Sequence, residues 1–521
     1  MNPDARTAYP VLILLALLLA APLLGLLNLG SMPGFEAEDL GFWHSAYIRR
    51  VLWFSLWQAL LSTVLSVVPA IWVARALARQ PNFPLRGLLL RLFGLPLVVP
   101  SVVAVMGVVS VYGSDGWIPL GRSLYGLNGI LLAHVFFNLP LAVRLLLPVW
   151  QSIPRQHWQI GEQLGFGPRA DWRWLEWPAL REALPGVMLL IFMLCLTSFA
   201  VVLTLGGGPR STTVEVAIYQ SLRFDFDPVR AVILALLQLA LCALVAVIAM
   251  RFQRLPEVEI TLSADAPATG VAPQIGSMLI ILLSAVFVGA PLLALLLDAI
   301  GGPVAEVLSN PVIWQAALHT LMIGLCATLL AVLFAWMLLQ TSSDLANRGH
   351  TGKARLIETC ASLIYVIPPL VIGTGYFVLL AGRVDVFDWV FAIVIGVNAL
   401  MGLPFVIRTL GPAMRQHRMR YRYLCQNLAL QGWNRFRWID WPLLRKPVGL
   451  SAALVVALTM GDLGVIALFG TPQTATLPLL IYQQLGAYLI SQATVTAMVL
   501  LGMCLLFFWL SERVIGGCDH A

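Results

Sequence analysis

Long apolar stretches, each about as long as a membrane-spanning helix, follow one another along the whole chain. A helix needs roughly 20 mostly apolar residues to cross the hydrocarbon core of a bilayer. Twelve stretches are predicted as transmembrane helices: 9–28, 52–75, 88–112, 128–150, 184–205, 229–251, 275–297, 313–340, 356–381, 388–411, 447–470 and 493–511. They lack the polar–apolar alternation of barrel strands, which disfavours a β-barrel. The fold is therefore predicted to be all-α and membrane-embedded.

Charge is too scarce in this chain to cover a surface that faces water. Hydrophobic residues make up 60% of the 521 residues and charged residues only 11%, whereas soluble domains carry about 25% charged residues. This composition excludes a soluble enzyme, a nucleic-acid-binding module and a disordered scaffold. The seven cysteines are scattered without a CxxC pair, so we expect neither a disulfide framework nor a metal site.

The basic residues divide unevenly between the predicted loops. Of the 32 Lys and Arg residues, 24 lie in the two tails and in the loops 75–91, 151–183, 251–275, 341–355 and 408–446. The alternate loops hold only four: Arg122, Arg210, Arg223 and Arg383. Because basic loops stay in the cytoplasm, both termini are predicted to be cytoplasmic. The first stretch is long enough to span, so it is predicted as an uncleaved helix rather than a signal peptide.

The sequence also predicts an internal repeat. Shifted by 264 residues, Leu139-Pro140 falls on Leu403-Pro404 and Trp177-Pro178 falls on Trp441-Pro442. Further matches, at this shift or at one changed by a single residue, are Arg173-Trp174 with Arg437-Trp438, Ser55 with Thr320, and Tyr219 with Tyr482. Six predicted spans separate the copies, and an even number gives both copies the same topology. We therefore predict two parallel six-helix repeats, 1–252 and 275–521, joined by a polar cytoplasmic linker at 253–274.

Each predicted repeat has one long cytoplasmic loop, at 151–183 and at 412–446, between its fourth and fifth spans. In each loop we expect a short helix, at about 154–164 and 418–430, followed by a turn and an amphipathic stretch rich in Trp and Arg. An interfacial aromatic belt would explain the Trp residues alone. It would not explain a helix–turn unit that occurs twice, which suits docking to a two-fold symmetric partner.

The two loops resemble the EAA loops of ATP-binding-cassette (ABC) importer permeases, whose consensus is E-A-A-x-x-x-G. The positions that match this motif are Gln159, Ile160, Gly161, Glu162, Leu164 and Gly165 in the first loop and Tyr423, Leu424, Cys425, Gln426, Leu428 and Ala429 in the second. Neither loop keeps E-A-A, and the second has alanine in place of the glycine. Longer segments, among them FSLWQALLSTVLSVVPAIWVARAL from Phe54 and LGGGPRSTTVEVAIYQ from Leu205, are similar to the bacterial thiamine (thiamine pyrophosphate) importer permeases. Ferric-iron importer permeases are the alternative group.

This resemblance implies a type I ABC importer permease fold in the bacterial inner membrane, surrounded by lipid. It also implies alternating access driven by two copies of an ATPase subunit, which bind the ATP, and a periplasmic thiamine-binding protein that delivers substrate. No enzymatic activity, cofactor or nucleic-acid partner is expected for the chain itself. In line with this, its two lysines, Lys353 and Lys446, lie outside any P-loop motif.

Four polar residues of the predicted spans are candidates for the transport pathway: Asp462, Ser198, Asn138 and Asn398. An intramembrane carboxylate such as Asp462 either attracts a cationic substrate or fixes helix packing. Ser198 occupies its position in the first repeat, and helix–helix hydrogen bonding is favoured for the two asparagines. An ion-coupled secondary transporter, the alternative class, would carry several such ionisable groups, whereas Asp462 is nearly alone.

The turn after each short helix is expected to need backbone freedom. Gly165 supplies that freedom in the first loop, because glycine adopts positive φ without steric cost. The equivalent residue in the second loop is Ala429. We therefore expect the second loop to tolerate substitution at this turn better than the first.

Overall fold

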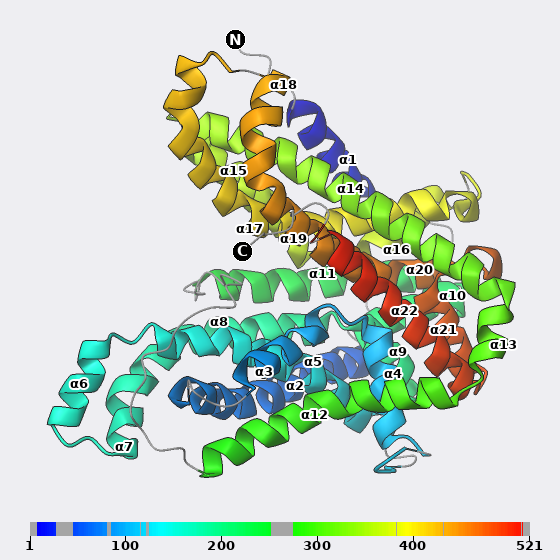
Figure 1. Ribbon diagram of the computed structural model, residues 1–521. Coiled ribbons are helices and arrows are strands. Elements are labelled where there is room, and N and C mark those ends of the chain that lie inside the picture. The colour runs from blue at the N-terminus through cyan, green and yellow to red at the C-terminus, as the bar shows by residue number, and fades with distance from the viewer. Residues whose placement is uncertain are drawn as a thin grey trace. The chain divides into compact units, whose positions relative to one another are not determined.

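The computed structural model of the chain is built of helices (Figure 1). It describes residues 8–27, 45–80, 85–114, 116–120, 124–251, 275–347, 349–381, 383–430, 432–511 and 513. Every regular element within these residues is a helix, which confirms the all-α prediction. The predicted linker at 253–274 lies outside the described residues.

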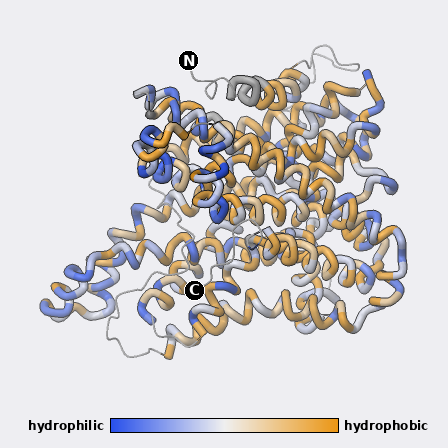
Figure 2. Tube along the Cα trace, turned by 45° about the horizontal axis from the view of Figure 1, so that its top comes forward, coloured by the Kyte–Doolittle hydropathy of each residue, from blue (hydrophilic) through white to orange (hydrophobic). Residues whose placement is uncertain are grey.

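Nine helices in the described part of the chain are long and apolar enough to cross a membrane. They are Ala46–Arg79, Leu127–Gln151, Pro168–Leu196, Pro228–Arg251, Ile275–Gly301, Pro311–Ala346, Val386–Tyr421, Gly432–Phe469 and Ile490–Leu510. Hydrophobic residues cover these helices along most of their length (Figure 2). Shorter apolar helices, Leu17–Leu27, Ser101–Tyr112 and Pro369–Leu380, lie where the other three predicted spans were expected. The chain is thus a multi-span helical protein, and the number twelve stays a prediction.

Two predicted spans, 88–112 and 356–381, are interrupted rather than continuous. The first is divided into α3 (Arg86–Leu92), the 3₁₀ turn η4 (Leu95–Leu97) and α4 (Ser101–Tyr112). The second is divided into α15 (Thr351–Leu363), η8 (Ile364–Val366) and α16 (Pro369–Leu380). Pro100 precedes α4 and Pro368 precedes α16. Proline lacks the N–H that a continuing helix needs and clashes with the preceding turn.

One compact unit comprises Trp43–Val216 and Ala240–Gly301. Its long helix α2 (Ala46–Arg79) packs along α5 (Leu127–Gln151) and α8 (Trp177–Leu196), and α12 (Ile275–Gly301) packs on α4 (Figure 1). The two backbones of α4 and α12 approach closely at Gly107. A Cβ atom added there would lie 2.6 Å from the carbonyl oxygen of Pro291, so only glycine permits this spacing.

The other compact unit comprises Met1–Phe42, Ala217–Leu239 and Gly302–Ala521. Here α14 (Pro311–Asn347) packs on α17 (Val390–Asn427) and α19 (Trp441–Met460), while α1 (Ala8–Leu27) packs on α16. A Cβ atom added to Gly375 of α16 would lie 2.4 Å from the carbonyl oxygen of Pro22 in α1. A glycine of one helix therefore meets a proline of another in both units.

The two compact units do not correspond to the two halves of the sequence. The N-terminal helix α1 packs in the unit that holds most of the C-terminal half, whereas α12 packs in the other unit. The proposed stretches 1–252 and 275–521 therefore describe sequence similarity, and their boundary stays a prediction.

Two more predicted spans, 184–205 and 447–470, end in short half-helices. The first continues from α8 into α9 (Phe199–Leu205), and the second from α19 into α20 (Gly464–Phe469). The remaining helices are α10 (Val214–Arg223), α11 (Pro228–Arg251), α13 (Val304–Ser309), α21 (Leu477–Gly486) and α22 (Ile490–Leu510).

Candidate functional site

The first of the two long predicted loops, 151–183, begins with α6 (Arg155–Gln163), a separate short helix. Pro154 precedes it and separates it from α5, which ends at Gln151. At its end, the Phe166 N–H donates to the Gly161 carbonyl (2.9 Å) and the Gly165 N–H to the Glu162 carbonyl (3.1 Å). This is a Schellman motif, which satisfies carbonyls that a helix end leaves free.

The second loop ends its helix in the same way but begins it differently. The Leu430 N–H donates to the Cys425 carbonyl (2.9 Å), and the Ala429 N–H donates to the Gln426 carbonyl (3.2 Å). The predicted separate helix at 418–430 is wrong, however, because α17 runs without a break from Val390 to Asn427. No proline stands where Pro154 interrupts the first copy, so the spanning helix continues into the loop.

The turn residue is left-handed in both loops, with φ of 70° at Gly165 and 50° at Ala429. Both loops therefore use the left-handed conformation at this turn, and the greater tolerance of the second loop to substitution stays a prediction. Alanine in this region carries roughly 1–2 kcal/mol of strain. A Cβ atom at Gly165 would meet no neighbour within 4 Å, so backbone strain alone opposes substitution there.

This geometry gives opposite expectations for the two turns. Gly165→Ala should lower the free energy of unfolding by about 1 kcal/mol, and Ala429→Gly should raise it or leave it unchanged, since glycine relieves the strain. Thermal unfolding of the purified protein in detergent tests both. A stabilising Gly165→Ala would contradict the left-handed turn.

The outer faces of the two short helical segments carry matched apolar side chains. Ile160 and Leu164 are 53% and 66% exposed, and their counterparts Leu424 and Leu428 are 46% and 60% exposed. The neighbouring side chains Gln159, Glu162, Tyr423 and Gln426 are exposed as well, whereas Gly161 and Cys425 are buried. Apolar side chains this exposed at the end of a loop helix are typical of a protein-binding surface.

A buried ion cluster holds the first loop to the end of α2. The Glu176 side chain is 0% exposed and accepts hydrogen bonds from Arg75 Nε (2.5 Å) and from Arg79 Nε (2.9 Å). Arg79 also contacts Asp171 in the loop, at 3.1 Å. Because two guanidinium groups flank one buried carboxylate, the segment of the loop that leads back to the membrane is held against α2.

Different polar contacts hold the second loop. Asp440, the residue at the position of Glu176, contacts His417 Nε2 (2.9 Å) and Arg435 Nε (3.4 Å). Nearby, Arg418 of α17 pairs with Asp344 of α14 at 2.5 Å. The carboxylate is thus kept in both loops, while its side-chain partners come from different elements.

Aromatic rings reinforce these anchors at matched positions. Each carboxylate ends a π-helical turn, η6 (Trp172–Glu176) or η10 (Phe436–Asp440). Trp172 stacks on Trp72 of α2 at 5.3 Å, and Phe436 lies edge-on against Trp336 of α14 at 5.5 Å. These anchoring residues were missed in the sequence analysis, although the shift of 264 also places Trp72 on Trp336.

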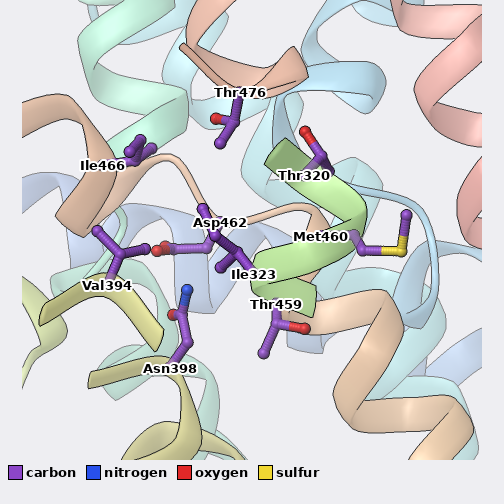
Figure 3. Close-up of a pocket in the computed structure, with 9 residues that line it drawn as sticks. All are labelled: Thr320, Ile323, Val394, Asn398, Thr459, Met460, Asp462, Ile466 and Thr476. Carbon is purple, nitrogen blue, oxygen red and sulfur yellow. The ribbon is translucent and has the colours of Figure 1, made fainter. Parts of the chain in front are cut away.

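Asp462 lies in the break between α19 and α20, where its Oδ1 accepts a hydrogen bond from the Gly464 N–H at 3.0 Å. Figure 3 shows its carboxylate directed toward Asn398, whose amide is a hydrogen-bonding neighbour. The two line a cavity of about 10 Å³ together with Thr320, Ile323, Val394, Thr459, Met460, Ile466 and Thr476. A cavity of this volume holds about one water molecule, so no organic substrate fits in this conformation.

The other two candidate pathway residues lie in the other compact unit. Asn138 is buried and its Nδ2 donates to Cys195 Sγ at 3.2 Å, as a helix-packing amide would. Ser198 stands between α8 and α9 with no side-chain hydrogen bond to the start of α9. The structure therefore pairs Asp462 with Asn398 only, and a pathway role for the four residues stays a prediction.

Many apolar spanning helices, interrupted helices and two anchored helix–turn loops define a multi-pass helical membrane protein. Comparison with known proteins specifies it further. Thiamine transport system permease proteins ThiP of Brucella abortus (strain 2308) and of Escherichia coli (strain K12) are 44% and 42% identical to the chain. The alignments cover 96% of this chain and 94% of the Brucella protein, and 92% of both in the second case. The chain belongs to the family of thiamine transport system permease proteins.

The Haemophilus influenzae protein of the same name is 38% identical over 488 residues. No protein-family model matches the chain. The family predicted from the sequence is thus confirmed, and the ferric-iron alternative is not favoured.

Proposed function

We propose that the chain is the membrane subunit of an ABC importer that carries thiamine or thiamine pyrophosphate across the bacterial inner membrane by alternating access. The observation that carries this proposal is the high identity to thiamine permeases over nearly the full length of both chains. The chain would be the non-catalytic, multi-pass component of the complex.

We infer that the fold consists of two parallel repeats. Support comes from features that recur at a shift of 264 residues: the Schellman ends at Gly165 and Ala429, the π-helical turns, and the carboxylates Glu176 and Asp440. Backbone conformation and buried charge recur here as well as residue identity. Such recurrence is expected if one ancestral unit was duplicated.

The two loops would dock onto two copies of an ATPase subunit, with Ile160 and Leu164 in one contact and Leu424 and Leu428 in the other. Their exposure and the firm attachment of each loop to a spanning helix support this role. Loop charge favours the cytoplasm for these loops and for both termini. A periplasmic binding protein would deliver the substrate from the opposite side.

Asp462 would contribute to the pathway only in a conformation that differs from this one, since its cavity is too small for thiamine. Its hydrogen bond to Gly464 instead supports a role in fixing the start of α20. Substrate attraction by this carboxylate is therefore the weaker of the two roles for the present conformation.

Charged residues on the exposed helical faces test the docking proposal. Leu164→Asp and Leu428→Asp should each reduce co-purification of the ATPase and thiamine uptake at least tenfold, because a buried unpaired charge opposes docking. Leu489→Asp, at a similarly exposed leucine in a predicted periplasmic loop, is the matched control for ATPase binding. Uptake of labelled thiamine by the wild-type complex, with thiamine pyrophosphate and ferric ion as competitors, tests the substrate. Normal co-purification in both loop variants would refute the docking surface.

A further inference from the structure

Two tyrosines of one compact unit, each on a short helix, form a hydrogen-bonded pair. Tyr219 lies on α10 and Tyr482 on α21, and their phenol groups are hydrogen-bonded. Tyr219 is only 5% exposed. A second contact joins the same regions, because Arg223 Nη2 donates to the carbonyl oxygen of Gly470 at 3.0 Å. Tyr219 and Tyr482 are equivalent residues of the predicted repeat, so the contact joins matching positions of the two copies.

Each of these short helices is fastened to a long helix by one matched hydrogen bond. The Val214 N–H at the start of α10 donates to Ser55 Oγ of α2 at 2.9 Å. The Leu477 N–H at the start of α21 donates to Thr320 Oγ1 of α14, also at 2.9 Å. Both hydroxyl groups are buried. A displacement of α2 or α14 along or about its axis therefore moves the short helix with it.

The same two long helices carry the loop anchors at their other ends. On α2, Ser55 is followed by Trp72, which stacks on the first loop, and on α14, Thr320 is followed by Trp336, which contacts the second. At 1.5 Å per residue, about 25 Å of helix separates the two contacts in each case. This is close to the thickness of the hydrocarbon core, roughly 30 Å. Each long helix thus links a loop on one side of the membrane to a tyrosine helix on the other.

We propose that the Tyr219–Tyr482 pair is the periplasmic gate of the transport pathway, opened and closed through α2 and α14. This inference rests on the proposed importer function and names residues that control it. A hydrogen bond between two phenols closes the passage without a buried charge, and its modest strength allows reversible opening. When the rings separate, their faces offer favourable contacts to a cationic substrate.

The electrostatic setting agrees with a closed gate. Burial raises the pKa of Tyr219 to about 12, with a contribution from Tyr482. The phenol therefore stays protonated, and able to donate, throughout the physiological pH range. Phe224 packs edge-on against the Tyr219 ring at 5.6 Å and holds it in place.

A reversible cross-link tests the gate in the assembled complex. In the double variant Tyr219→Cys/Tyr482→Cys, a bifunctional methanethiosulfonate about as long as the two rings should bridge the cysteines. Bridging should lower thiamine uptake at least tenfold, and a reductant should restore it. The treated single variants and the treated wild type, which carries the natural cysteines, are the controls. Uptake at the untreated rate in the bridged protein, or failure to bridge, would overturn the proposal.

A second variant keeps the proposal testable if the cysteine pair folds poorly. Tyr219→Phe/Tyr482→Phe retains both rings and removes only the hydrogen bond between them. Weakening the closed state should raise ATP hydrolysis in the absence of binding protein several-fold, because the open state becomes more populated. Unchanged hydrolysis would count against the gate. If the untreated wild-type complex takes up no thiamine, the proposed function fails instead, and the two failures are therefore distinguishable.

Discussion

Replacing Glu176 with alanine is expected to produce the largest loss of coupling of any single change outside the docking faces. Glu176 is fully buried between Arg75 and Arg79, so its removal leaves two cations close together without their shared partner. Removing one partner of a buried ion pair costs roughly 3–5 kcal/mol. The loop would detach from α2, and its movement would no longer reach the membrane helices.

Thiamine uptake and ATP hydrolysis should therefore become uncoupled in this variant. Uptake, normalised to membrane-inserted complex, should fall more than tenfold, while hydrolysis by the bound ATPase should lose its dependence on substrate delivery. Glu182→Ala is the matched control, because Glu182 is an exposed glutamate in the helix that follows the loop. Glu176→Asp should recover part of the activity. Equal effects of Glu176→Ala and Glu182→Ala on uptake would show that the anchor transmits nothing.

Enlarging Gly107 or Gly375 to leucine should abolish folded protein in the membrane or nearly so. A Cβ atom alone at these positions would lie 2.6 Å and 2.4 Å from backbone oxygens of the opposing helix. Neither oxygen belongs to a flexible side chain that can move away, so the helices must separate. Overpacking typically costs about 1–3 kcal/mol even where side chains can adjust, and a backbone clash should cost more.

Gly502→Leu is the control for this pair of variants. Gly502 also lies in a spanning helix, α22, but nothing approaches the position of its missing Cβ atom within 4 Å. Leucine favours a helix more than glycine does, so this variant should insert normally. The yield of monodisperse protein in mild detergent and its melting temperature report the difference. Normal yields of the Gly107 and Gly375 variants would contradict the close approach of α4 to α12 and of α1 to α16.

The membrane class and the loops could be predicted because they depend on local sequence. A run of about 20 apolar residues is long enough to cross the membrane as a helix, whatever it packs against. The Trp-Pro pairs and the short loop helices were likewise visible as repeated residue types. The separate helix at 418–430 was mispredicted, because a loop pattern does not reveal whether the preceding span stops when no proline interrupts it.

Side-chain partners could not be predicted, because they join residues far apart in the chain. In the sequence, Arg75 and Glu176 are charged residues of two separate predicted loops. Only the fold brings them together as a buried pair. Asp462 looked like a lone intramembrane carboxylate, but the structure places it at a helix break where a backbone N–H satisfies one of its oxygens.

The sequence by itself determined that this chain is a multi-span helical membrane protein with two related loops, since hydropathy and residue spacing act locally along a helix. Tertiary structure alone decided which helices pack against one another, with α1 on α16 and α12 on α4. It also decided that Tyr219 meets Tyr482. In lipid, apolar side chains fit lipid and protein about equally well, so hydrophobicity does not select helix partners. Close-fitting glycines, buried ion pairs and hydrogen bonds select them, and these form only when distant segments meet.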